Sequence, residues 1–210
     1  MKSLAIWYGD PATAPAADVL VLGEGVEQYN HWAYKTAAVM ASKRKVFGYV
    51  SVGDRRYAED KRGPLSTARM LTAIEEWEQL GAEGVLLDEF GYDYWNDDGE
   101  MNVRQAAALG MCHSLGLTPV MNAWAPADCP WSATAPGDVY LFESWQKDMG
   151  ESDRLKWWRD NHRAGTEAWA VTTAPVPGRL CVSGERRARS VAERFGISAF
   201  QYGVDDRYGT

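Results

Sequence analysis

Cysteine is scarce in this chain of 210 residues and follows no metal-binding pattern. Cys112, Cys129 and Cys181 lack the paired spacing typical of zinc ligands. Three cysteines also cannot build a disulfide framework. We expect at most one bridge, between the two loop cysteines, Cys129 and Cys181.

Histidine is equally scarce, with three residues, and each falls on a predicted helix away from the strand ends. Surface or helix-packing roles are therefore expected for His31, His113 and His162. This placement disfavours a metal-dependent hydrolase. We predict neither a metal ion nor a cofactor.

The chain also lacks an excess of positive charge and a long apolar run. Its 22 basic and 29 acidic residues give a net charge of −7, which disfavours electrostatic binding to nucleic acid or to an anionic membrane. No segment approaches 18 uncharged apolar residues, and no charged leader precedes an apolar stretch, so we expect neither a membrane span nor a signal peptide. Residues 1–210 are expected to form one domain, and we favour a monomer.

Aromatic residues are abundant instead, with 10 Trp and 10 Tyr. Many lie at predicted strand ends rather than within helices. Aromatic rings stack on the apolar faces of sugars. The composition thus favours a carbohydrate ligand.

Short runs rich in β-branched and aromatic residues predict eight strands, at 3–8, 18–22, 46–52, 84–90, 118–124, 138–145, 166–173 and 197–203. Helical periodicity lies between most of them, at 29–43, 66–80, 101–115, 152–164 and 184–195. Four glycines that precede strands, Gly81, Gly116, Gly165 and Gly196, are expected to close helices in the left-handed conformation.

Eight strands alternating with helices predict an α/β fold, a compact (β/α)8 TIM-type barrel. The connection at 9–17 is too short for an ordinary helix, and 125–137 is a Pro-rich loop, so reduced helices are expected there. An open, doubly wound sheet is the alternative.

Active sites of such barrels lie at the carboxyl ends of the strands. Those ends are polar or aromatic here, with Trp7-Tyr8, Glu24, Tyr49, Ser51, Asp88-Glu89, Asn122, Trp124, Glu143, Trp145, Thr172, Gln201 and Tyr202. A ring of carboxylates, amides and aromatic groups suits a carbohydrate.

Two apolar runs end in acids two strands apart, Val85-Leu86-Leu87 before Asp88-Glu89 and Tyr140-Leu141-Phe142 before Glu143. The intervening strand separates their ends by on the order of 9 to 10 Å at the backbone. Side chains that reach inward bring the carboxyl groups closer than the backbones, to a separation found in glycoside hydrolases. In such enzymes one carboxyl group acts as the acid and the other as the base or nucleophile. Alternation lets only one of Asp88 and Glu89 aim into the barrel.

The elements Gly48-Tyr49-Val50-Ser51 and Gly84-Val85-Leu86-Leu87-Asp88-Glu89, with Trp77 between them, resemble the spherulin-4-like glycoside hydrolases and, more distantly, the polygalactosaminidase barrels. The resemblance covers about residues 20–145. It implies a (β/α)8 barrel that cleaves galactosamine-containing exopolysaccharides outside the cell or at its envelope, with Asp88, Glu89 and Glu143 as the acidic constellation. The aromatic loop 90–95 departs from the family pattern.

We hypothesise that Glu143 is the general acid/base, with Phe142 and Trp145 as apolar surroundings that favour its protonated form. Asp88 would be the nucleophile or would orient an N-acetyl group, and Glu89 would support it, although the roles of Asp88 and Glu89 are open to exchange. The proposed sugar contacts are Tyr8, Tyr49, Asn122, Trp124, Trp145 and Gln201.

Other interpretations remain open from the sequence. A catalytically inactive barrel would keep the aromatic platform for sugar binding. A phosphate-handling barrel would use Ser183-Gly184-Glu185 at the start of a helix, although this signal is weak. Asp93, Asp97 and Asp98 would suit a cation, but a solvated loop explains them better.

Overall fold

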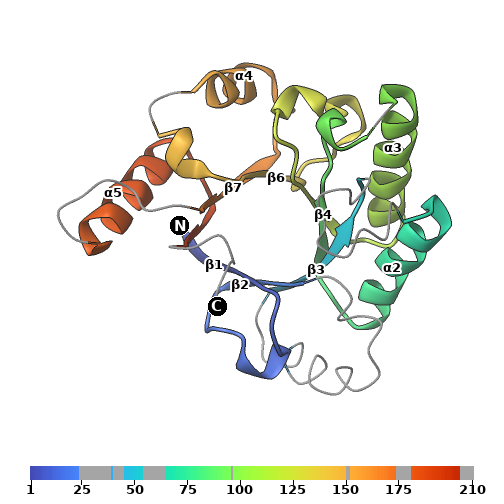
Figure 1. Cartoon of the computed structure of the whole chain (residues 1–210), viewed down its shortest axis with the longest axis horizontal. Coiled ribbons are helices and arrows are strands. Elements are labelled where there is room, and N and C mark those ends of the chain that lie inside the picture. The colour runs from blue at the N-terminus through green and yellow to red at the C-terminus, as the bar shows by residue number, and fades with distance from the viewer. Residues whose placement is uncertain are drawn as a thin grey trace.

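Eight parallel strands close into a barrel in the computed structural model (Figure 1). In chain order they are β1 Lys2–Trp7, β2 Val19–Leu22, β3 Lys45–Ser51, β4 Gly84–Asp88, β5 Thr118–Met121, β6 Val139–Phe142, β7 Glu167–Thr172 and β8 Ala199–Tyr202. The barrel closes where Lys2 and Ser3 pair with Ala199 and Phe200. The predicted (β/α)8-type barrel is confirmed, and the open sheet is excluded.

The structure describes residues 1–23, 39, 45–53, 65–95, 97–149, 152–173 and 181–203, without the side chains of 98 and 181–183. Within these ranges, four helices lie outside the ring of strands: α2 Thr67–Gln79, α3 Asp98–Ser114, α4 Asp153–Asn161 and α5 Cys181–Arg194 (Figure 1). The strand end at Glu24 and the helix predicted at 29–43, apart from residue 39, lie outside the described residues.

Side chains cap three of these helices at their amino ends. Ser66, Asp97 and Ser152 each accept a hydrogen bond from a backbone N–H of the first turn. The four predicted glycines, Gly81, Gly116, Gly165 and Gly196, have φ of 86°, 73°, 91° and 75°. Gly81, Gly116 and Gly196 follow the ends of α2, α3 and α5, whereas α4 already ends at Asn161, so Gly165 belongs to the turn before β7 and does not close a helix. Asp97 therefore caps α3, which accounts for one of the three acids of its loop.

Two connections lack a full helix, as predicted. Between β1 and β2 the chain forms the 3-10 turn Pro11–Thr13, and between β5 and β6 it forms the turns Pro126–Asp128 and Trp131–Ala133. The barrel is therefore trimmed in the first and fifth units.

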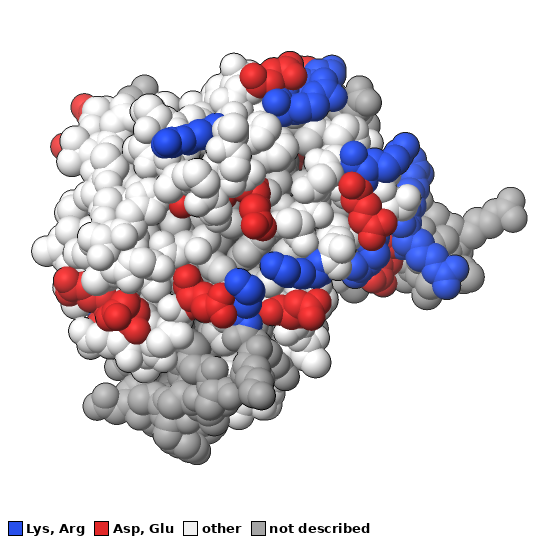
Figure 2. All heavy atoms as spheres, turned by 180° about the vertical axis from the view of Figure 1, so that it is seen from behind, with Lys and Arg blue, Asp and Glu red and all other residues white. Residues whose placement is uncertain are grey.

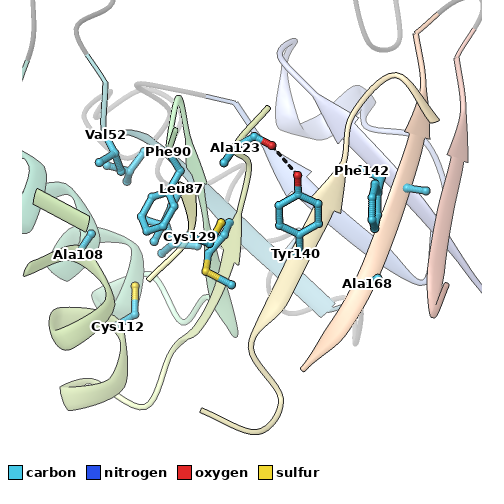
Figure 3. Close-up of a cluster of buried hydrophobic side chains, with 14 of the residues drawn as sticks. Val52, Leu87, Phe90, Ala108, Cys112, Ala123, Cys129, Tyr140, Phe142 and Ala168 are labelled. Atoms are coloured by element: carbon cyan, nitrogen blue, oxygen red, sulfur yellow. Dashed lines mark hydrogen bonds between the residues drawn. The ribbon is translucent and has the colours of Figure 1, made fainter. Parts of the chain in front are cut away.

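Two apolar layers stabilise the barrel, one on each side of the sheet. The interior is filled by alternate strand residues, including Ile6, Val21, Tyr49, Leu86, Val120, Leu141, Val171 and Ala199. The outer layer packs the opposite strand faces against the helices, and Figure 3 shows part of it, with the Tyr140 hydroxyl donating to the Ala123 carbonyl at 2.7 Å. Because both strand faces are buried, the strands appear in sequence as unbroken apolar runs.

Cys112 and Cys129 are free thiols buried in this outer layer (Figure 3). Burial raises the pKa of Cys112 to about 12 and that of Cys129 well above its usual value. The bridge expected between Cys129 and Cys181 is therefore wrong. Cys129 packs as a small apolar side chain instead.

Gly48 allows α2 to approach the sheet closely. A Cβ atom at this position would lie 2.1 Å from Cδ2 of Trp77, whose indole is completely buried and donates to the Tyr49 carbonyl at 3.3 Å. The Gly48-Tyr49 element and Trp77 thus form one packing unit.

Gly48→Ala is expected to lower the free energy of unfolding by about 1–3 kcal/mol, because the added methyl group displaces the Trp77 ring. Gly110→Ala is the matched control. Gly110 is exposed in α3 with open space around it, so alanine there should raise the same free energy by about 0.5–1 kcal/mol. Urea unfolding of the two variants checks this. Equal effects of the two substitutions would contradict the packing argument.

Charges of both signs are interspersed on the face shown in Figure 2, where lysine and arginine lie beside aspartate and glutamate. The ion pairs Lys45–Glu83, at 2.9 Å, and Arg69–Glu76, at 2.8 Å, illustrate this mixing. Among the described helices, none combines the length and the apolar character needed to cross a bilayer.

Candidate active site

Strand alternation determines which side chains reach the mouth of the barrel, its carboxyl end. Tyr49, Leu86, Val120 and Leu141 point into the interior. Because successive residues alternate, the side chains two positions later share that direction, namely Ser51, Asp88, Asn122 and Glu143. Asp88, rather than Glu89, therefore follows the inward direction of β4.

Asp88 lies at the centre of a hydrogen-bond network. Its Oδ2 accepts from the Tyr49 hydroxyl, and its Oδ1 accepts from Asn122 Nδ2 at 2.6 Å. Removal from water and, next, the charge of Glu143 raise the pKa of Asp88 to about 7, against the lowering effect of the Tyr49 hydrogen bond. The carboxyl group is thus held in place by two donors and titrates near neutrality.

Asn122 joins the two candidate acids. The same Nδ2 atom that donates to Asp88 also lies 3.1 Å from Oε2 of Glu143. The two carboxylate oxygens are therefore at most about 5.7 Å apart, the sum of the 2.6 Å and 3.1 Å distances. This upper limit, which holds for one oxygen of each carboxyl group, lies below the roughly 6.5–9.5 Å separation of inverting glycosidases and is compatible with the roughly 5–5.5 Å of retaining ones.

Glu89 has a left-handed backbone, with φ of 53°, so its side chain does not follow the simple alternation of β4. Its Oε2 accepts a hydrogen bond from Ser51 Oγ at 2.8 Å. Gly53 makes room for this turn, since a Cβ atom there would lie 2.5 Å from the Cβ of Glu89. Glu89 consequently links the ends of β3 and β4.

Tyrosines surround the acids. Tyr8 is 49% exposed and packs edge-on against Tyr49, with ring centroids 5.7 Å apart. Burial, followed by the charges of Asp88 and Glu143, raises the pKa of Tyr94 to about 12. Tyr94 belongs to the 3-10 turn Tyr92–Tyr94 after β4. The sequence prediction missed Tyr94, although the aromatic loop that contains it was recognisable.

Trp124 and Gln201 also lie at strand ends. Trp124 is 40% exposed, with Arg154 and Lys147 over its ring at 4.5 Å and 4.9 Å from the centroid. Gln201 Oε1 accepts from the Ile6 backbone N–H at 2.9 Å, so it helps to close the seam between β8 and β1. Asn122, Tyr8, Tyr49, Trp124 and Gln201 thus all project from the carboxyl ends of strands.

Trp145 is not at the mouth, and its predicted sugar contact is wrong. It is completely buried in the outer layer, where its indole N–H donates to the Ala188 carbonyl at 3.3 Å. Phe142 packs against it in the same layer, with ring centroids 5.6 Å apart. The apolar surroundings predicted for Glu143 therefore lie on the opposite face of the sheet.

The weaker alternatives gain no support from the structure. Helix α5 begins at Cys181, so Ser183-Gly184-Glu185 lies inside its first turns rather than before it. Among the described residues, no group of three or more His, Cys, Asp and Glu side chains is arranged to hold a metal ion.

Solved structures with similar folds include two proteins in complex with an amino sugar and one glycoside hydrolase domain. Aspergillus fumigatus Ega3, in complex with galactosamine, has a TM-score of 0.61 at 15% identity, covering 98% of this chain and 91% of its own. The glycoside hydrolase domain of Pseudomonas aeruginosa PelA has a TM-score of 0.57 at 16% identity, and the match covers 99% of this chain and 96% of that domain. Aspergillus clavatus Sph3, in complex with GalNAc, has a TM-score of 0.57 at 16% identity, and the match covers 96% of this chain and 88% of Sph3.

These similarities confirm the predicted resemblance at the level of the fold. Barrels with other activities, including sugar epimerases and an endonuclease, reach TM-scores of 0.57 to 0.60 at 8–9% identity. No protein-family model and no curated protein matches the chain. Glycoside hydrolase domains therefore share this barrel fold with enzymes of other kinds, and the chemistry has to be argued from the site.

Proposed function

We propose that the protein is a glycoside hydrolase that cleaves a polysaccharide containing galactosamine or N-acetylgalactosamine. The observation that carries this proposal is the pair Asp88 and Glu143, joined by the amide of Asn122 at the mouth of the barrel. Ega3 with galactosamine and Sph3 with GalNAc support the choice of sugar.

The surroundings of the two acids differ, which suggests their roles. Both oxygens of Asp88 accept hydrogen bonds, from Tyr49 and Asn122, so this carboxylate is fixed in orientation as a nucleophile requires. Glu143 is half-buried and has access to water for proton exchange. We assign Asp88 as nucleophile and Glu143 as general acid/base.

The reaction then proceeds in two steps. Glu143 donates its proton to the glycosidic oxygen while an Asp88 oxygen attacks the anomeric carbon, so the leaving sugar departs and a glycosyl ester forms. Glu143, now ionised, takes a proton from water, which attacks the same carbon and releases Asp88. Tyr8 and Trp124 would contact sugar faces.

Release of reducing ends tests the function. Wild-type protein is incubated with a panel of polysaccharides led by an α-1,4-linked galactosamine/N-acetylgalactosamine polymer, beside Glu143→Gln and Asp88→Asn. Release by the wild type alone supports the hydrolase. Absence of release from every polymer, with saccharide binding intact, would leave a sugar-binding barrel.

The carboxylate separation leads to a stereochemical prediction. We expect the first product to keep the anomeric configuration of the substrate, because oxygens at most about 5.7 Å apart favour attack by Asp88 over a water held between the acids. Proton NMR of the anomeric signals during the first minutes, before mutarotation, checks this. An inverted first product would contradict the assignment of Asp88.

A further inference from the structure

Arg154, in the first turn of α4, contacts the backbone of Glu143. Its Nη2 donates to the Glu143 carbonyl oxygen at 3.0 Å and to Asp148 Oδ2 at 2.8 Å. The Arg154 side chain is 14% exposed and that of Asp148 is 1% exposed. The guanidinium is therefore held between a buried carboxylate and the strand end that carries the proposed acid.

The start of α4 fixes this ion pair. Ser152 caps the helix by accepting from the Leu155 N–H at 3.2 Å, and its hydroxyl also donates to Asp148 Oδ1. Asp148 is thus bonded on both oxygens. A buried ion pair of this kind tolerates little displacement, because a misplaced partner leaves an uncompensated charge.

The same guanidinium plane lies against the rim of the mouth. Its central carbon is 4.5 Å from the centroid of Trp124 and 5.7 Å from that of Phe142. Trp124 follows β5 and Glu143 follows β6. One planar group therefore contacts the ends of two neighbouring strands.

We propose that Arg154 is a positioning residue that fixes Glu143 and Trp124 relative to each other, so that the acid and the sugar-contacting ring act on one bound substrate. The proposal rests on the proposed function. A guanidinium suits the role because it stacks on an indole while donating several hydrogen bonds in its plane, whereas a lysine ammonium offers no plane to stack.

Arg154→Lys tests the proposal, with Arg189→Lys as the matched control. Arg189 also stacks on an aromatic ring, Phe200 at 5.4 Å, and pairs with an acid, Glu185 at 3.6 Å, but it lies on α5 in the outer layer. We expect Arg154→Lys to lower kcat about 10- to 100-fold, because displacement of Glu143 by about 1 Å costs up to that factor. Arg189→Lys should leave kcat and KM within about twofold, as expected for a surface arginine.

A readout without catalysis separates this proposal from the proposed function. The Glu143 charge acts on Asp88, so a displaced Glu143 should shift the carboxyl titration of Asp88, followed by carbon-13 NMR, downward in Arg154→Lys, toward its value in Glu143→Gln. An inactive wild type would refute the hydrolase, and the titration would still test Arg154. An unchanged titration and an unchanged kcat, with only a lower Tm, would overturn the positioning role.

If Arg154→Lys does not fold, Asp148→Glu serves instead, because it keeps the buried pair charged and moves the guanidinium by about one methylene. The same fall in kcat and the same downward titration shift are expected. An Asp148→Glu variant that folds and matches the wild type in both would overturn the proposal.

Discussion

Asp88→Asn is expected to lower kcat/KM on a galactosamine-containing polymer by about 10⁴-fold or more, because an amide oxygen cannot form the glycosyl ester. Loss of fold is not the reason. The raised pKa of Asp88 means that its ionisation costs folding free energy, and this cost grows from about pH 3.8 to about pH 7 and is complete above that. The asparagine variant should therefore match or exceed the wild type in stability at pH 8.

Azide distinguishes the roles of the two acids. In Asp88→Ala, azide enters the space that the carboxylate vacates, attacks the anomeric carbon and should give a glycosyl azide of inverted configuration. In Glu143→Gln, which should lose about 10²–10⁴-fold, azide should instead give the retained configuration by attack on the ester. The raised pKa of Asp88 would also suit a proton donor, and that reversed assignment predicts the opposite pattern of azide products.

Activity should fall about tenfold per pH unit above neutrality, because the first step needs one proton on the pair of acids, carried by Glu143. The pKa of Asp88 is raised from 3.8 to about 7 by burial and then by the charge of Glu143, so the two interacting carboxyl groups lose their last proton near pH 7. The pH profile of kcat/KM for the wild type measures this limb.

Glu143→Gln tests whether the charge of Glu143 contributes to the raised pKa of Asp88. Glu143→Gln removes the proton donor and its charge, so the fall above neutrality should disappear and the residual activity should instead fall on the acid side, where Asp88 becomes protonated. The same substitution leaves burial unchanged, so the pKa of Asp88 in this variant should stay above the ordinary value of an aspartate. A wild-type activity that stays constant from pH 7 to pH 9 would contradict the raised pKa of Asp88.

The fold was largely predictable because strands buried on both faces appear as short apolar runs separated by helical periodicity. For the same reason, the sequence could not show which of Asp88 and Glu89 points into the barrel. When both faces are apolar, alternation leaves no mark in the sequence, so only the packed interior, with Leu86 pointing inward, determines the phase of β4.

Two non-glycine residues at the site are left-handed, and one of them explains the wrong prediction for Trp145. Ser144, with φ of 59°, follows Glu143 and turns the chain so that Trp145 enters the outer layer rather than the mouth. Glu89 turns the chain after β4 in the same way, with φ of 53°. Non-glycine residues seldom adopt this conformation, and neither serine nor glutamate signals it in a sequence.

The side chains inside the barrel determine how a polymer can be handled. Phe47 and Trp169 meet edge-on there at 4.9 Å between ring centroids, among the aliphatic side chains of the other strands. Such an interior is a solid core rather than a pore. A polysaccharide therefore cannot be threaded through the molecule. A polysaccharide substrate of the proposed hydrolase would have to lie across one end of the barrel, and both products of cleavage would leave from that same end.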